Sequence, residues 1–270
     1  MSRRPLTAAV VAGVAAAGAM ALRHTLPAAA RQRWDRKNHA GSTVTLLEGP
    51  AYAVAAALGG LAAGPSALPV VTVSLGAGAF GALDDLAGDS TSKGLKGHLG
   101  ALSRGEVTTG AVKILGLAAT GLVGAALADR VSGRGPVATA VGGAAIAGAA
   151  NVANLLDLRP GRALKAVALT AVPLLVPPSA AGASTAAAAL GAAAGVAPGD
   201  LRGESMLGDT GANAAGALLG LALVERLGLR GRLVVLAATA GLTVLSERVS
   251  FSRVIEDTPA LRRLDRWGRP

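Results

Sequence analysis

Residues 81–89, Gly81-Ala82-Leu83-Asp84-Asp85-Leu86-Ala87-Gly88-Asp89, stand where a long apolar run over 67–83 ends. An unpaired charge buried in a membrane is energetically expensive, so a carboxylate at the edge of an apolar span usually marks function. Asp84 and Asp85 are therefore the first candidate site residues of the chain, and Asp89 is a third carboxylate beside them.

The composition predicts a helical membrane protein. Of the 270 residues, 51% are hydrophobic and only 16% are charged, and the mean hydropathy is +0.51. A soluble protein of this length needs more charged surface, so we expect an all-α, polytopic helical membrane protein. The chain has no Cys, which excludes disulfides, thiolate catalysis and Cys-ligated zinc.

Nine apolar stretches divide the chain into about nine predicted transmembrane helices. They cover residues 6–22, 43–63, 67–83, 108–127, 136–150, 164–177, 182–197, 211–224 and 232–246. Several are shorter than the roughly 20 residues usual for a span. We expect one integral membrane domain, 1–246, followed by a basic tail, 247–270. The first stretch also fits a signal peptide, with a small-residue cleavage site at 28–30.

The distribution of charge predicts the topology. If nine spans alternate, the loops on one side carry 19 Lys and Arg and those on the other side carry 7. The positive-inside rule places the first group in the cytoplasm, with the N-terminus outside and the C-terminus cytoplasmic. Cleavage of residues 1–30 would reverse that placement, so we expect the first span to be retained. The net charge of +10 then reflects basic loops rather than a nucleic-acid partner.

Acidic residues concentrate on the same predicted cytoplasmic face, which holds 14 of the 16 Asp and Glu. Three loops there carry the candidate site residues. They are Asp84 and Asp85 with Lys93 and Lys96; Asn151, Asn154 and Asp157; and Asp209, between two glycines at the start of a helix.

These residue types suit a magnesium site for phosphorylated substrates. Carboxylates from separate loops hold Mg²⁺ through oxygen ligands, and substrate phosphates complete its shell. Lys93 and Lys96 would neutralise a diphosphate. The helix that begins near Asp209 would offer free backbone N–H groups to a phosphate.

The chain resembles the polyprenyl-phosphate N-acetylhexosamine-1-phosphate transferases, which include phospho-MurNAc-pentapeptide transferase. Three motifs carry the resemblance in the family's order, over about residues 37–224. They are Asp84-Asp85 at the end of a span, Asn151-x-x-Asn154-Leu155-x-Asp157, and Met206-Leu207-Gly208-Asp209-x-Gly211.

The resemblance implies a Mg²⁺-dependent transfer of a sugar-1-phosphate from a UDP-sugar to a polyprenyl phosphate, with release of UMP. Asp84, Asp85 and Asp209 would be catalytic, and Mg²⁺ would bind mainly to Asp209, with Asp85 as a second ligand. Asn151, Asn154 and Asp157, with Lys93 and Lys96, would bind substrate. It further implies a multi-pass protein of the cell membrane with a cytoplasmic active site in envelope-polymer synthesis, and it allows a homodimer.

The chain departs from the family at Pro160, where the family has an Asp, and it lacks the family's His-rich last loop. The alternative function is therefore a catalytically silent relative that binds lipid phosphate or scaffolds envelope assembly. A transporter or channel is less favoured, because the apolar spans, apart from Glu48, lack the intramembrane charges expected of an ion path. For the tail, an interfacial amphipathic segment is favoured over phosphate binding by Arg248 and Arg253.

Overall fold

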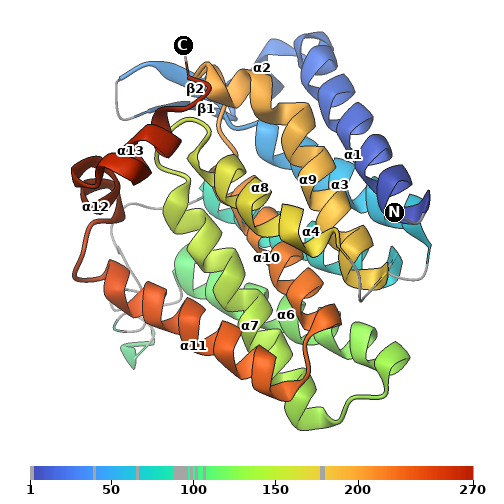
Figure 1. Cartoon of the computed structure of the whole chain (residues 1–270). Helices are drawn as coiled ribbons and strands as arrows, with labels where there is room; N and C mark the ends of the chain where they lie inside the picture. Colours follow the sequence, from blue (N-terminus) through green and yellow to red (C-terminus); the bar gives the residue numbers. More distant parts are fainter. Residues whose placement is uncertain are drawn as a thin grey trace.

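The computed structural model of the chain is a bundle of long helices (Figure 1). It describes residues 3–38, 41–64, 67–87, 97, 100, 103–105, 108–176 and 180–269. The predicted site residues Asp89, Lys93 and Lys96 lie outside the described residues, and so does His98.

Within the described residues, nine long helices overlap the nine apolar stretches of the sequence. They are α1 (Arg3–Leu22), α3 (Glu48–Ala63), α4 (Ala67–Ala87), α6 (Thr109–Ser132), α7 (Pro136–Leu156), α8 (Arg162–Leu174), α9 (Ala180–Leu201), α10 (Gly208–Arg226) and α11 (Leu229–Ser246). Six helices within the described ranges are long and apolar enough to cross a membrane, namely α1, α4, α6, α7, α9 and α11. The chain thus has the helices of a multi-pass membrane protein. With 16 and 13 residues, α3 and α8 are shorter than a typical span.

Shorter elements lie before and after these helices. They are η1 (Arg23–Thr25), α2 (Ala28–Gln32), β1 (Asp35–Lys37), β2 (Thr43–Thr45), α12 (Phe251–Asp257) and α13 (Pro259–Arg266). β1 and β2 form an antiparallel hairpin in which Asp35 pairs with Thr45. The predicted span 43–63 is therefore wrong at its start, where β-branched residues form a strand. The hairpin also holds the loop before α10, because the Met206 N–H donates to the Thr45 carbonyl at 3.1 Å.

α10 is the central helix of the bundle. It packs against α3, α4, α7 and α9, and its residues 210–222 are all buried. α1 covers α9 and α3, α6 packs on α4 and α7, and α11 packs on α7. Small residues allow these approaches: a Cβ on Gly121 of α6 would lie 2.4 Å from the Gly143 carbonyl oxygen of α7. Small residues at this crossing therefore let the two helix backbones approach closely.

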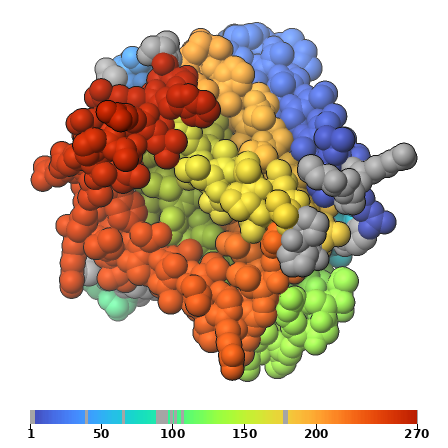
Figure 2. Space-filling view, in the orientation of Figure 1, coloured from blue at the N-terminus to red at the C-terminus, as the bar shows by residue number. Residues whose placement is uncertain are grey.

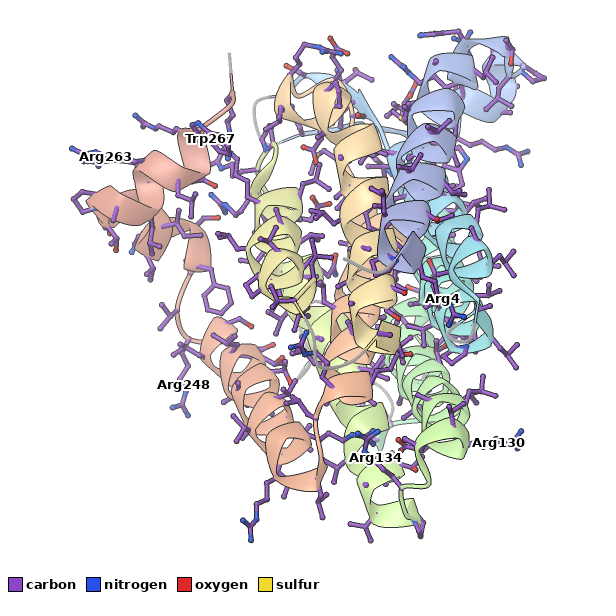
Figure 3. The ribbon with its side chains drawn as sticks, turned by 45° about the vertical axis from the view of Figure 1, so that its right-hand side comes forward. Arg4, Arg130, Arg134, Arg248, Arg263 and Trp267 are labelled. Atoms are coloured by element: carbon purple, nitrogen blue, oxygen red, sulfur yellow. The ribbon has the colours of Figure 1, made fainter. Side chains whose placement is uncertain are left out.

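The outer surface of the bundle is apolar. Val14 on α1 is 70% exposed, and Val234 on α11 is 68% exposed. Figure 2 shows α11 and the tail helices α12 and α13 together forming one side of the molecule. Figure 3 shows Arg263 of the tail pointing away from the bundle and Trp267 near the end of the tail, whereas Arg130 and Arg134 lie toward the opposite end of the bundle. Exposed aliphatic side chains on long helices are what a lipid environment requires.

The two ends of the bundle differ in their chemistry. One end, called the site end below, contains the hairpin, the starts of α3, α6 and α10, and the ends of α4, α7 and α9 (Figure 1). At the opposite end Arg232 is fully buried and donates to both oxygens of Asp129, at 2.6 and 2.7 Å. Arg232 also donates to the carbonyls of Val224 and Ala138. This buried ion pair therefore ties α6, α7, α10 and α11 together.

Candidate active site

Lys113 connects the two predicted catalytic residues Asp84 and Asp209. Its ammonium group, on the second turn of α6, donates to Asp84 Oδ2 at 2.6 Å and to Asp209 Oδ2. Asp84 belongs to the last turn of α4, and Asp209 to the first turn of α10. The three side chains are only 17–22% exposed, so each ion pair is partly shielded from solvent. The structure thus brings Asp84 and Asp209 together and places a cation between them.

Asp85 has a different position from its neighbour. Its Oδ1 accepts the backbone N–H of Asp209 at 3.0 Å, and its Oδ2 accepts the backbone N–H of Thr210 at 2.9 Å and the Thr210 hydroxyl at 2.6 Å. A carboxylate placed there satisfies N–H groups that the first turn of a helix leaves unpaired. It also meets the positive end of the helix dipole.

The sequence-based expectation that this helix start offers its N–H groups to a phosphate is wrong for Asp209 and Thr210. Asp85 already occupies the anion position there. As arranged here, Asp85 fixes the start of α10, and its predicted roles in catalysis and metal binding remain hypotheses.

Two glycines allow the carboxylates to meet α10. A Cβ on Gly81 would lie 2.3 Å from the Asp209 carbonyl oxygen, so only glycine lets α4 approach so closely. Gly208 has φ +59°, a conformation that glycine adopts without strain. The Gly-Asp-x-Gly motif thereby turns the chain so that Asp85 reaches the first amides of α10.

Arg36 of the hairpin also contacts this region. Its guanidinium donates to the main-chain carbonyl of Asp85, which belongs to the last turn of α4. A second nitrogen of the same group donates to the carbonyls of Arg33 and Asp35. The hairpin therefore fastens the segment before it to the end of α4. In the sequence, Arg36 is only one of the 19 basic residues assigned to this face.

The predicted site residues Asn151, Asn154 and Asp157 do not lie together in the structure. Asn151 donates to the Thr243 hydroxyl at 2.9 Å, so its side chain joins α7 to α11. Asn154 is half-buried one turn later. Asp157, just after α7, is 7% exposed. Burial and the nearby carboxylate of Asp200 raise the pKa of Asp157 well above its usual value, although a hydrogen bond from the Gly208 backbone opposes this. Asp157 thus lies near the start of α10, whereas Asn151 points to another helix.

Two further carboxyl groups are buried at the site end and were not identified from the sequence as site residues. Glu48 is 0% exposed and accepts the Ser205 hydroxyl at 2.5 Å; Asp200 is 1% exposed and accepts the Gly161 N–H at 2.7 Å. One oxygen of each, and one of Asp157, has no hydrogen-bond partner among the described residues. Glu48 had a sequence signal, as the only acidic residue in a predicted span, whereas Asp200 resembled an ordinary loop residue.

The carboxylates of this site are the kind of oxygen ligand that Mg²⁺ binds. Within the described ranges, no group of three His, Cys, Asp or Glu side chains is arranged to hold a metal ion. Mg²⁺ usually binds through one or two carboxylates and keeps waters or substrate phosphates as its other ligands. Asp84 and Asp209, which face one cation already, are such a pair. The residues therefore fit a magnesium ion shared with a phosphorylated substrate.

No protein-family model matches this chain, and no curated protein matches it.

Proposed function

We propose that the protein is a Mg²⁺-dependent membrane transferase that moves a sugar-1-phosphate from a UDP-sugar to a polyprenyl phosphate and releases UMP. The observation that supports this proposal is the Asp84–Lys113–Asp209 arrangement at one end of a membrane helix bundle. Anionic groups converge on one cation where a lipid phosphate and a soluble nucleotide would meet. The resemblance carried by the three sequence motifs supplies the reaction.

The chemistry requires positioning and neutralisation of charge more than covalent catalysis. An oxygen of the lipid phosphate attacks the sugar-linked phosphorus of the donor, and the bond from that phosphorus to the UMP oxygen breaks. Lys113 would leave its carboxylate partners to neutralise the phosphates. Asp84 would orient the acceptor phosphate and take its proton. Mg²⁺, held by Asp209, would stabilise the negative charge that develops on UMP.

The proposal includes the topology and location of the protein. It has nine spans, an N-terminus outside, a C-terminus in the cytoplasm and a location in the cell membrane. In support, the nine long helices alternate in direction, so that the tail and the candidate site share one end (Figure 1). The loops assigned to that end carry 19 of the 26 Lys and Arg. The positive-inside rule favours the cytoplasm for such an end.

Release of UMP by the purified full-length protein tests the reaction. The assay contains Mg²⁺, polyprenyl phosphate and a panel of UDP-sugars. We expect Asp84→Asn and Asp209→Asn to lower the rate by at least about 100-fold, because each removes a charge that the reaction uses. Asp257→Asn is the matched control, because Asp257 is an exposed carboxylate of the tail. Equal activity of all three variants would contradict the assigned roles.

One observation favours the alternative, a catalytically silent protein that binds lipid phosphate or acts as a scaffold. Lys113 already neutralises Asp84 and Asp209, and Asp85 is engaged with α10. Such a site is stable without substrate. Binding of polyprenyl phosphate without UMP release from any donor would establish this alternative and exclude the transferase.

A further inference from the structure

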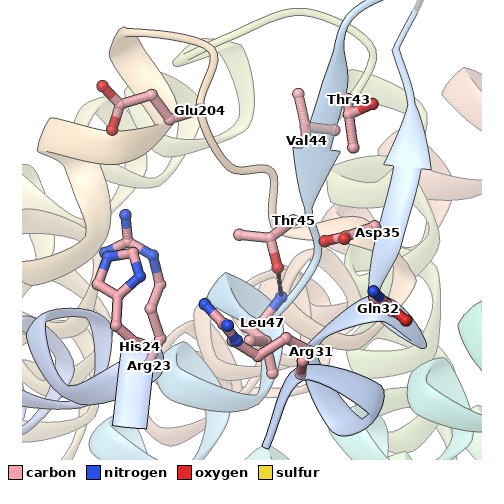
Figure 4. A pocket seen from close by; sticks show the side chains of 11 residues that line it. Arg23, His24, Arg31, Gln32, Asp35, Thr43, Val44, Thr45, Leu47 and Glu204 are labelled. Carbon is pink, nitrogen blue, oxygen red and sulfur yellow. Dashed lines mark hydrogen bonds between the residues drawn. The ribbon is translucent and has the colours of Figure 1, made fainter. Parts of the chain in front are cut away.

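A polar cavity, separate from the Asp84–Lys113–Asp209 arrangement, lies at the site end beside the hairpin (Figure 4). Its volume is about 360 Å³. It lies between η1 at the end of α1, the short helix α2, the hairpin and the loop before α10. Figure 4 shows the side chains of Arg23, His24 and Arg31 entering it, with Asp35 on the facing wall and Glu204 above.

The cavity holds more free positive than free negative charge. Among the described residues, neither Arg23 nor Arg31 forms a salt bridge; Arg23 donates to the Met20 main-chain carbonyl at 2.5 Å, which leaves its charge without an acidic partner. Within the part of the chain that the structure describes, the Nε of Arg31 is buried and has no hydrogen-bond partner. Burying a guanidinium nitrogen without a partner is costly, and two guanidinium groups on one cavity repel each other. An anion between them would remove both penalties.

The acids that line the cavity do not cancel this charge. Both oxygens of Glu204 accept from Arg202, at 2.7 and 3.0 Å, so Glu204 is already neutralised. Asp35 remains as one carboxylate against Arg23 and Arg31, with His24 beside them. A single carboxylate among cationic groups suits a ligand that carries both a phosphate and a hydroxyl, because the carboxylate can accept a hydrogen bond from the hydroxyl.

The position of the cavity favours a membrane lipid as the source of the anion. The apolar segment Arg4–Thr25 is long enough to cross a membrane, and Arg23 and His24 lie at its end. Leu22 and Leu26 beside them are 62% and 41% exposed, as expected for side chains in contact with acyl chains. Arg23 therefore lies at the depth where lipid headgroups are found.

We propose that this cavity binds the phosphate group of an anionic membrane lipid, held by Arg23 and Arg31, with a headgroup hydroxyl directed to Asp35. Arginine suits this role because its planar fork of N–H groups matches two phosphate oxygens. The ligand would be a component of the cytoplasmic leaflet, and it is distinct from the substrates proposed for Asp84 and Asp209. The proposal does not depend on transferase activity.

Native mass spectrometry of the full-length protein in detergent tests the proposal. The probes are phosphatidylglycerol, which has a phosphate and free hydroxyls, and phosphatidylcholine, whose headgroup carries no net charge. We expect phosphatidylglycerol to bind more tightly, and Arg23→Gln and Arg31→Gln each to weaken it about tenfold, the effect of losing one charge-assisted hydrogen bond. Arg31→Lys keeps the positive charge but lacks the planar fork of N–H groups, so it should lose less affinity for phosphatidylglycerol than Arg31→Gln.

Arg33→Gln is the matched control, because Arg33 is exposed in the same segment and does not line the cavity. The proposal would be overturned if Arg33→Gln lost as much affinity for phosphatidylglycerol as Arg23→Gln and Arg31→Gln. It would also be overturned if the unaltered protein bound the two lipids equally. Thermal unfolding of each variant shows whether it is folded. Competition by inorganic phosphate or glycerol phosphate distinguishes the sources: displacement at low concentration would assign the cavity to a free phosphate, and no displacement assigns it to the lipid.

Discussion

Asp85 and Thr210 are joined by two hydrogen bonds, since Asp85 Oδ2 accepts both the backbone N–H and the hydroxyl of Thr210, at 2.9 and 2.6 Å. This contact links the end of α4 to the start of α10, the most buried helix of the bundle. A helix cap supplied from another helix couples the position of α4 to the folding of the core. We therefore assign Asp85 first to the stability of the site.

Asp85→Ala should lower the free energy of unfolding by about 2 kcal/mol, because it leaves two amides and a hydroxyl without their acceptor. Asp85→Asn keeps one acceptor oxygen and should lose about half as much. Circular dichroism during denaturation in detergent measures both changes. Unchanged stability of Asp85→Ala together with lost UMP release would instead show that Asp85 acts in the reaction.

Removal of the cation between Asp84 and Asp209 should make the protein respond to Mg²⁺. In Lys113→Met the two carboxylates face each other without a positive partner, which costs stability. An added divalent cation that binds between them would restore it, because a ligand that binds only the folded state raises the unfolding temperature. We expect Mg²⁺ to raise that temperature more in Lys113→Met than in the unaltered protein.

The control for this prediction is Lys113→Met combined with Asp84→Asn. The repulsion is then absent, and the response to Mg²⁺ should disappear. An equal response of the single and double variants would contradict a cation site between Asp84 and Asp209.

The helices could be predicted from the sequence because each apolar run carries its own signal. The sequence also predicted that Asp84 and Asp209 lie at the same end of the bundle, since both lie at ends of spans that alternate in direction. Lys113 could not be identified as their partner, because only the packing of α6 beside α4 selects it from the other basic residues of that face. The same holds for Arg232 and Asp129, whose pairing depends on four helices meeting.

Single cysteines test the orientation of the bundle, because the natural chain has none. Ser132 and Arg202 are exposed residues near opposite ends. Ser132→Cys should react with an impermeant thiol reagent in intact cells, and Arg202→Cys only after the cells are opened. Ala186→Cys, which is buried in α9, is the unreactive control. Labelling of both exposed positions in intact cells would contradict the proposed topology.

The tail is held to the bundle by a buried ion pair that should make its docking sensitive to acid. Arg162 of α8 donates to both oxygens of Asp265, at 2.8 and 3.3 Å, and Arg269 lies 2.9 Å from the same carboxylate. Burial alone would raise the pKa of Asp265, but these guanidinium groups hold it below its usual value. A lowered pKa in the folded state stabilises docking above the unfolded pKa of about 3.9, and that contribution is lost as the pH falls through the folded pKa.

Asp265→Asn should release the tail at neutral pH, because it leaves Arg162 buried without its charge partner, at a cost of about 3 kcal/mol. Hydrogen exchange of residues 259–266 measures the docking, and in the unaltered protein its protection should fall only below about pH 4. Glu256→Gln is the matched control: its pair with Arg159 spans 3.3 Å, but both side chains are well exposed. An exposed pair contributes less than about 1 kcal/mol, so this variant should keep its protection. If Glu256→Gln and Asp265→Asn lose protection equally, general charge on the tail holds it in place, and the buried pair does not.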